Sequence, residues 1–218
     1  MNSTPIQQSF EISWASADEK KWLLKRLVSL KRQTMNIRLM QDARFVILKS
    51  DGVPIGWGGL DISFQREYPE LFSLSLDPEF RNYSLGGVIE LARASFLLSQ
   101  GVRFAFVRMT DDSAGVSLLS KRLNSQFYER IDPSELKSEY VQLCRNCELY
   151  QSTCRRNVFL KFDVQKFFAH SVTELGAVPD NLPRQFRIIR VGEQRKISGD
   201  HGEKTHIWNS YRPLWLNF

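Results

Sequence analysis

The pattern of hydrophobic and polar positions in the first part of the chain predicts strands and one helix. Four segments have the alternation and the β-branched and aromatic content of strands: residues 9–15, 43–49, 53–64 and 71–76. Between the first two, residues 17–33 repeat apolar side chains three and four positions apart, with lysines and arginines between them, as a helix with one buried face does. The turn sequence Ser50, Asp51, Gly52 predicts that the second and third strands pair as a hairpin.

The second part of the chain predicts a long helix and further strands. Residues 84–100 are amphipathic and end at Gly101, which suits a helix C-cap. The segments expected after this helix are a strand at 102–109, a short helix at 114–124, and strands at about 138–143 and 157–164. Strands and helices mixed in this order predict an α/β protein with a mixed sheet, and 218 residues are enough for one such core.

The junction between the strand at 71–76 and the helix after it carries the clearest chemistry. A Pro turn stops the strand, and Ser84, Gly86 and Gly87 let the backbone approach a ligand where the helix begins. The first amides of a helix have no intrahelical acceptor and lie at the positive end of its dipole. The junction therefore predicts a site for a phosphate or pyrophosphate group.

This junction resembles the signature of the GNAT superfamily of acyl-CoA-dependent N-acyltransferases, which reads Arg or Gln, two residues, Gly, one residue, and Gly or Ala. The matching residues are Arg81, Asn82, Tyr83, Ser84, Leu85 and Gly86. Ser84 stands where the family usually has Gly, and we expect a right-handed turn there, which a serine tolerates. The order of strands and helices also resembles that of the family, over roughly residues 9–164.

The resemblance implies a GNAT-like fold and a site for an acyl donor. The sheet would have about seven mostly antiparallel strands, splayed between the fourth and fifth, with helices on both faces. In the family, the pantetheine arm of the donor lies in that splay and pairs with the fourth strand, which implies Leu74 and Leu76. The donor pyrophosphate would bind the backbone of Arg81, Asn82, Tyr83, Ser84, Leu85, Gly86 and Gly87.

The resemblance also implies a carboxylate base. In the histone acetyltransferase branch, a Glu lies six residues before the strand position that pairs with the pantetheine, and counting back from Leu76 gives Glu70. Asp61, Glu67 and Tyr68 lie nearby in the sequence, and the alternative role for them is to bind the amine.

The acid that would protonate the leaving thiolate is not where the family has it. Many members carry a Tyr in the helix after the fifth strand, whereas this chain has Lys121 and Arg122 there. Three alternatives stay open: Ser120 as the acid, Tyr128 as the acid, or departure of the thiolate with protonation by water.

The expected function is transfer of an acyl group, by default acetyl, from a CoA thioester to a primary amine by direct attack. Acetyl-CoA or another acyl-CoA would be the co-substrate. Two alternatives stay open: a long-chain N-acyl amino acid synthase that uses an acyl carrier protein, and a non-catalytic binding module of the same fold.

A net charge of +6 suits the phosphates of CoA or an acidic carrier protein, or else marks a solvated basic surface; the signal for nucleic acid is weak.

All three cysteines, Cys144, Cys147 and Cys154, lie within eleven residues. In a protein expected to be cytosolic, the CxxC pair favours a metal site or free thiols over a disulfide. A structural zinc would need a fourth ligand, for which His170 and Glu148 are the candidates. A redox-sensitive pair and unreactive half-buried thiols are the alternatives.

Three glycines, Gly56, Gly58 and Gly59, surround Trp57 on the third predicted strand. They either open space at the sheet surface for an acyl or acceptor pocket, or mark a bulge beside a packed Trp.

We expect residues 1–170 to form the GNAT-like domain and residues 171–218 a C-terminal extension of unassigned role. The aromatic end of the extension would dock on the body, on a partner subunit or on a substrate channel, and a homodimer is one such arrangement. No apolar run is long enough to span a bilayer and the first residues lack the features of a signal peptide, so we expect a cytoplasmic protein.

Overall fold

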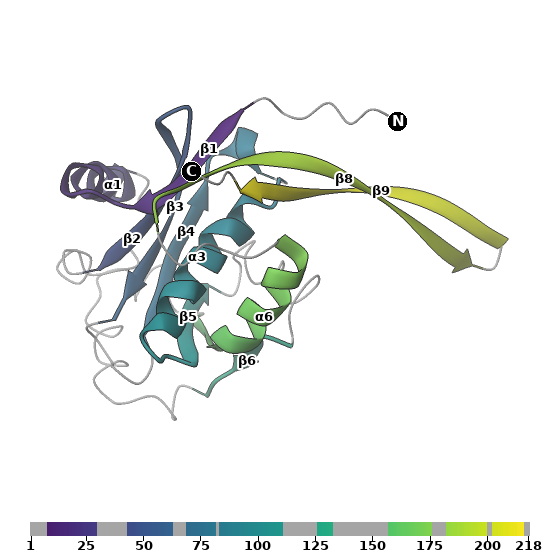
Figure 1. Ribbon diagram of the computed structural model, residues 1–218. Coiled ribbons are helices and arrows are strands. Elements are labelled where there is room, and N and C mark those ends of the chain that lie inside the picture. The colour runs from purple at the N-terminus through teal and green to yellow at the C-terminus, as the bar shows by residue number, and fades with distance from the viewer. Residues whose placement is uncertain are drawn as a thin grey trace.

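The computed structural model is built around one mixed β-sheet (Figure 1). It describes residues 8–29, 43–62, 69–81, 83–110, 126–132, 157–175, 182–199 and 202–215. Within these residues the sheet has nine strands in the order β6-β7-β5-β4-β3-β2-β1-β8-β9. The strands are β1 (Ser9–Trp14), β2 (Arg44–Ser50), β3 (Val53–Asp61), β4 (Glu70–Leu76), β5 (Phe104–Thr110), β6 (Tyr128–Arg130), β7 (Asn157–Asp163), β8 (Arg184–Gly199) and β9 (Gly202–Trp215). The helices are α1 (Ala17–Ser29), the short 3-10 helix η1 (Pro78–Phe80), α3 (Leu85–Ser99) and α6 (Val164–Leu175).

The predicted fold class, a mixed and mostly antiparallel α/β sheet with helices on both faces, is confirmed. All strand pairs are antiparallel except β4 and β5. The prediction of about seven strands was too low, because the C-terminal region adds β8 and β9 to the edge that β1 would otherwise form. The predicted helix at 114–124 and strand at 138–143 lie outside the described residues.

Helices cover the two faces of the sheet, and alternate residues of β2 show which helix covers which face. Val46 and Leu48 belong to the core cluster beneath α3. Phe45 and Ile47 point the opposite way and belong to the cluster that Leu23 of α1 covers. Helix α6 lies beside α3 on the same face (Figure 1). The central strands are thus buried on both sides.

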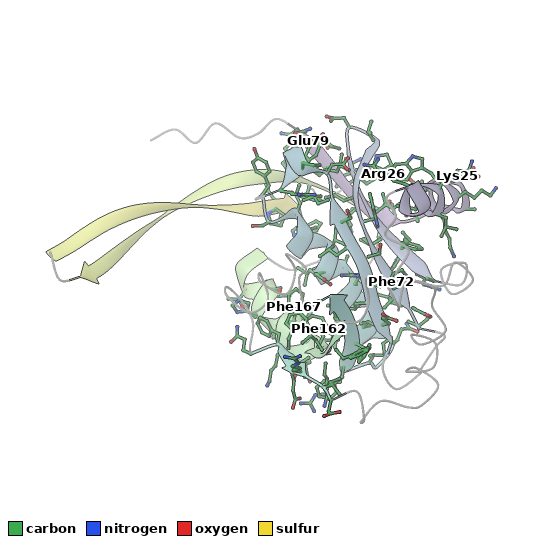
Figure 2. All side chains as sticks on the ribbon, turned by 180° about the vertical axis from the view of Figure 1, so that it is seen from behind. Lys25, Arg26, Phe72, Glu79, Phe162 and Phe167 are labelled. Carbon is green, nitrogen blue, oxygen red and sulfur yellow. The ribbon has the colours of Figure 1, made fainter. Side chains whose placement is uncertain are left out.

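Helix α6 is not among the elements that the sequence predicted. The strand expected to run to residue 164 ends at Asp163, whose Oδ1 accepts a hydrogen bond from the backbone N–H of Lys166 at 3.0 Å. Asp163 therefore acts as the N-cap that starts the helix. Phe162 and Phe167 lie close together behind the sheet (Figure 2), with ring centroids 5.0 Å apart, and fix the helix against β7.

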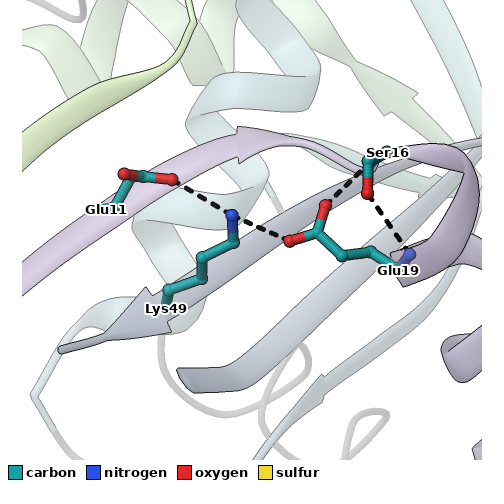
Figure 3. A network of polar contacts seen from close by, with 4 residues as sticks. All are labelled: Glu11, Ser16, Glu19 and Lys49. Atoms are coloured by element: carbon teal, nitrogen blue, oxygen red, sulfur yellow. Dashed lines mark hydrogen bonds and ion pairs between the residues drawn. The ribbon is translucent and has the colours of Figure 1, made fainter. Parts of the chain in front are cut away.

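Helix α1 begins with a capping box that is linked to the sheet (Figure 3). The N–H of Ser16 donates to Glu19 Oε2 at 2.8 Å, and the N–H of Glu19 donates to Ser16 Oγ at 3.3 Å. Lys49 Nζ of β2 lies 2.8 Å from Glu19 Oε1 and 3.2 Å from Glu11 Oε1 of β1. Although burial by itself would raise the pKa of Glu19, the hydrogen bonds from Lys49 and Ser16 hold that pKa below its ordinary value.

The strands β8 and β9 form a long hairpin whose base lies on the body of the protein and whose remainder extends away from it (Figure 1). Only residues 184–187 of β8 pair with β1. The two strands pair with each other from Phe186 and Trp215 to Gly199 and Gly202. We call residues 188–212 the arm. At the base, the ring of Phe186 stacks on Phe10 at 5.5 Å and contacts Trp215 at 5.0 Å.

The division into residues 1–170 and 171–218 stays a prediction. Helix α6 runs across residue 170, and β8 continues the sheet of the first region. In the described part of the chain, no helix combines the length and the apolarity that a bilayer span requires.

Candidate functional site

Strand β4 contains a bulge near its middle. The register between β3 and β4 shifts by one residue between Trp57 and Gly59, so that two residues of β4, Ser73 and Leu74, lie opposite Gly58. Ser73 has φ 55°, in the left-handed region that favours glycine. A bulge bends its strand and increases the local twist. The second alternative for the glycines around Trp57, that they mark a bulge, is therefore the one that applies.

Beside the bulge, β4 separates from β5. The two strands run parallel and pair only at Glu70 with Phe106 and Leu71 with Val107. In the described residues no pair follows, although both strands continue. The predicted splay between the fourth and fifth strands is thus confirmed. From Phe72 to Leu76, the edge of β4 that faces β5 is not part of a ladder with it, which leaves room for an extended ligand to pair with the strand.

The predicted pantetheine residues lie on this separated part of β4. Leu74 is 42% exposed, which is unusual for a large apolar side chain in a central strand. Leu76 is half-buried beside α3, and its carbonyl oxygen accepts a hydrogen bond from Arg81 Nε at 3.2 Å. Arg81 therefore links the end of the open strand to the start of the loop that leads into α3.

The loop before α3 ends in an uncapped helix N-terminus. Ser84 is the N-cap, but its side chain makes no capping hydrogen bond, and the first turn of α3 contains no acidic residue. A side chain added at Gly86 would meet no protein atom within 4 Å, whereas Leu85 is buried and anchors the helix. The first turn of α3 thus has open space beside Gly86 and backbone amides without a side-chain cap at the positive end of the helix, a geometry suited to an anion.

The backbone of Ser84 differs from the prediction. We expected a right-handed turn, but Ser84 has φ 60° and ψ 10°, in the left-handed region. The reason is the tight turn from η1 into α3, which takes a conformation that Gly adopts without steric cost. Tyr83 is half-buried and packs with Phe80 against the core beneath α3, and Asn82 lies outside the described residues.

Glu70, the predicted base, lies where β4 and β5 still pair. It is 5% exposed and stands directly opposite Asp61 of β3, which is 1% exposed. Cross-strand partners point to the same face of a sheet, so the two carboxylates are neighbours. Glu67 and Tyr68, the other candidates, lie outside the described residues.

Of the three alternatives for the acid, the structure describes only Tyr128. Its ring stacks on Phe162 with centroids 4.8 Å apart, in the core beneath α3 and α6. Burial, and secondarily the Glu90 carboxylate, raise the pKa of Tyr128 above its ordinary value. Tyr128 is therefore a weaker acid than an exposed tyrosine. Ser120, Lys121 and Arg122 lie outside the described residues.

The cysteines that predicted a zinc site, Cys144, Cys147 and Cys154, also lie outside the described residues. The same holds for Glu148, whereas His170 lies on α6 with its ring 5.3 Å from that of Phe127. Among the residues that the structure does describe, no three His, Cys, Asp or Glu side chains gather as metal ligands. The zinc site stays a prediction.

Trp57 is a packed residue and lines no open surface. It is 1% exposed, and its ring forms a T-shaped contact with that of Trp22, with the ring centroids 6.2 Å apart. The guanidinium of Arg26 on α1 (Figure 2) lies 5.4 Å from the Trp57 ring and bonds Asp77 Oδ1 at 2.7 Å. These contacts tie α1 to the loop that follows β4.

Sequence reasoning missed Arg93, a buried arginine of α3 that reaches the bulge. Its Nη1 donates to the backbone carbonyl oxygens of Gly59 at 2.8 Å and Phe72 at 3.1 Å. One signal was present in the sequence: Glu90 and Arg93 are the charged residues of the otherwise mostly apolar segment 85–98, and their spacing of three places them one turn apart as a pair.

No protein-family model and no curated protein matches this chain. Solved structures do match. One is an acetyltransferase of the GNAT family from Staphylococcus aureus, with a TM-score of 0.53 and 13% identity over 71% of this chain and 99% of that one. Another is N-acetylglutamate synthase from Neisseria gonorrhoeae complexed with coenzyme A and N-acetyl-glutamate, with a TM-score of 0.50 and 15% identity over 70% of this chain and 35% of that one.

Sequence identities this low relate the proteins by fold, and activity has to be argued from the site. Over about 70% of its length, this chain has the GNAT fold.

Proposed function

We propose that this protein is an N-acyltransferase that moves an acyl group from a CoA thioester to a primary amine. The observation that carries the proposal is the continuity of two features: the edge of β4 that β5 leaves open, and the uncapped N-terminus of α3 a few residues later. The first suits the amide groups of a pantetheine arm, and the second suits a pyrophosphate. CoA carries both groups in this order.

The reaction is a direct transfer. The amine nitrogen attacks the thioester carbonyl carbon, the C–N bond forms, the C–S bond breaks, and the thiolate leaves as free CoA. We assign to Glu70 the removal of the proton that the amine must lose. Supporting this role are the burial of Glu70 and its position on β4, one residue before the last pair with β5.

In the proposed reaction, no tyrosine acts as the general acid that protonates the leaving thiolate. Tyr128, the one described alternative, has a pKa above its ordinary value because it is buried, and so holds its proton tightly. A CoA thiolate is stable enough near neutral pH to leave first and take a proton from water afterwards. The enzyme's contribution would then be positioning and removal of the amine proton.

Thermal unfolding of the full chain with acetyl-CoA, a long-chain acyl-CoA or free CoA tests the proposal. A ligand at a hundredfold excess over its Kd stabilises the native state by about 2.7 kcal/mol, which corresponds to a rise in Tm of roughly 5–10 °C. The strongest stabiliser identifies the donor class. Absence of any shift would contradict a CoA donor and favour a carrier-protein donor or a non-catalytic module.

Two variants assign the effect to the proposed groups. Arg81→Glu should abolish the shift, because it puts a negative charge beside the pyrophosphate, whereas Arg103→Glu makes the same charge change beyond the other end of α3 and should keep it. With an amine acceptor identified, Glu70→Gln should lower kcat by about a hundredfold and leave the donor shift intact. A Glu70→Gln enzyme of normal kcat would exclude Glu70 as the base.

A further inference from the structure

A buried guanidinium lies at the place where β4 leaves β5. Arg93 of α3 has 1% of its side chain exposed and forms an ion pair with Oε1 of Glu90 one turn earlier. Its Nη1 donates to the carbonyl oxygens of Gly59 on β3 and Phe72 on β4, at 2.8 and 3.1 Å. One side chain thus holds the main chain of two strands.

The two carbonyl groups occupy a particular position in the sheet. Gly59 and Phe72 are the last regular pair before the register shifts at the bulge. On the other side of β4, pairing with β5 ends at Leu71, one residue before Phe72. Phe72 is therefore the residue of β4 where the bulge begins, where pairing with β5 has ended and where Arg93 donates a hydrogen bond.

The sheet is built to admit this side chain. A side chain added at Gly58 would come within 2.7 Å of Ile89 Cγ2 and 3.1 Å of Arg93 Cζ and Nε, so Ile89 and the guanidinium together fill the space that a strand side chain would normally occupy. Replacing a buried ion pair by apolar side chains is often neutral or stabilising, so stability alone is a weak reason for Arg93 and Glu90. A bulge with Ser73 in the left-handed region, in contrast, needs surrounding contacts to hold it.

We propose that Arg93 is the positioning residue that holds β4 in its bulged course away from β5 and so keeps the strand edge open for the pantetheine arm of the donor. The inference rests on the proposed function. Arg93 touches no substrate in this role, since it lies beneath the sheet and acts through the carbonyl oxygens of Gly59 and Phe72. The inference predicts that a variant can lose recognition of the pantetheine group and still recognise the pyrophosphate.

The test uses a double variant of the full chain, Glu90→Gln with Arg93→Met. Changing both partners avoids an unpaired buried carboxylate, and methionine retains most of the apolar stem of Arg93 while removing both hydrogen bonds. Arg93→Lys is the conservative variant, because a lysine keeps the charge but lacks the planar fork. Arg44→Met is the matched control: Arg44 of β2 lies over the rings of Trp14 and Phe96, away from β4.

The readout is the Kd of coenzyme A and of ADP, which carries the pyrophosphate without the pantetheine arm. We expect the wild type and Arg44→Met to bind CoA at least about tenfold more tightly than ADP. The double variant should bind both ligands about equally, with its ADP affinity unchanged. The preference of Arg93→Lys for CoA over ADP should lie between these two. Hydrogen exchange at the amides of residues 73–76 should accelerate in the double variant, while α3 stays protected.

The outcomes are distinct. A double variant that keeps the preference for CoA, or that loses CoA and ADP affinity to the same extent, overturns the inference and leaves the proposed function standing. If the double variant does not fold, the comparison between Arg93→Lys and the wild type decides: an unchanged preference for CoA overturns the inference. A wild type that binds neither ligand overturns the proposed function, and the inference with it.

Discussion

Two serines beside the candidate donor site have backbone conformations that glycine adopts most easily. Ser73, at the bulge of β4, has φ 55°, and Ser84, the N-cap of α3, has φ 60°. The left-handed region costs an L-residue about 1 kcal/mol relative to glycine. Proteins retain local costs of this kind mainly where function needs the geometry, so the two serines bracket the segment of greatest interest.

Substitution of Ser84 by glycine should therefore stabilise the fold. We expect Ser84→Gly to raise the free energy of unfolding by up to about 1 kcal/mol, because the steric cost disappears and no capping hydrogen bond is lost. Chemical denaturation measures the change. The control is Ser13→Gly in β1, where φ is not positive and the same substitution should lower stability by about 0.5–1 kcal/mol. Equal effects at both positions would contradict the conformational argument.

At the level of elements, α1 is joined to the sheet by polar and aromatic contacts at separate points. Its first turn binds Lys49 of β2 through Glu19, and further along Arg26 lies over Trp22 and Trp57 and bonds Asp77. The side chains of Lys49 and Glu19 are 18% and 22% exposed, so their ion pair is partly shielded from solvent. Helix α1 is therefore fixed to β2, to β3 and to the loop that follows β4, and this loop leads to the proposed donor site.

The Glu19 network predicts a pH-dependent contribution to stability. The pKa of Glu19 is lower in the folded protein than its ordinary value of 4.5, so its contribution is present above that pH and is lost as the pH falls through the folded pKa. We expect Glu19→Gln to cost about 1 kcal/mol at pH 7 and almost nothing at a pH well below 4.5.

Chemical denaturation of the wild type and Glu19→Gln across this pH range measures the difference. The matched control is Asp18→Asn, one residue earlier, whose side chain is 94% exposed and forms an ion pair with Lys21. It should change stability little at any pH. A Glu19→Gln penalty that persists in acid would mean that the side chain acts by packing rather than by charge.

On the scale of the whole molecule, the arm stands apart from the rest of the sheet (Figure 1). Beyond Arg187, β8 pairs with β9 alone. A two-stranded ribbon is marginally stable in water, whereas the base of the hairpin belongs to the core through Phe186, which is fully buried. The hairpin thus combines a base in the core with an extension that pairs with no other strand of the described sheet.

Trimming the arm should leave the fold intact. Replacing residues 191–210 by an Asn-Gly turn joins the paired residues Arg190 and Tyr211, and we expect Tm to change by less than about 2 °C. Phe186→Ala at the base should cost about 3 kcal/mol. Both are measured by thermal unfolding followed by circular dichroism. Loss of cooperative unfolding in the trimmed variant would show that the arm supports the core.

Most of the central fold could be predicted from the sequence, because the hydrophobic periods of β1 to β5 and of α3 are local and regular. Residues 192–206 of the arm could not: their cross-strand pairs are largely polar, and nothing in their hydrophobicity distinguishes a ribbon from a loop. Helix α6 was missed because it starts directly after β7, at a cap provided by Asp163.

The candidate site was predictable in part. The signature at Arg81 to Gly86 identified the loop before α3, but the conformation of Ser84 depends on how η1 turns into the helix, which the sequence does not encode locally. Arg93 was missed for a different reason. Its role depends on Gly58 and Phe72, which lie far from it in the chain and meet it only in the folded sheet.

The bulge in β4 is a difference in the number of residues between two paired strands, so it depends on chain length more than on side-chain identity. Exchanging Ser73 for another residue would keep the count, whereas deleting it would remove the extra residue, restore a regular ladder with β3 and take away the bend in β4. This part of the chain should therefore tolerate substitution and reject insertions or deletions. A binding edge made of main-chain atoms can persist while the sequence around it changes almost completely.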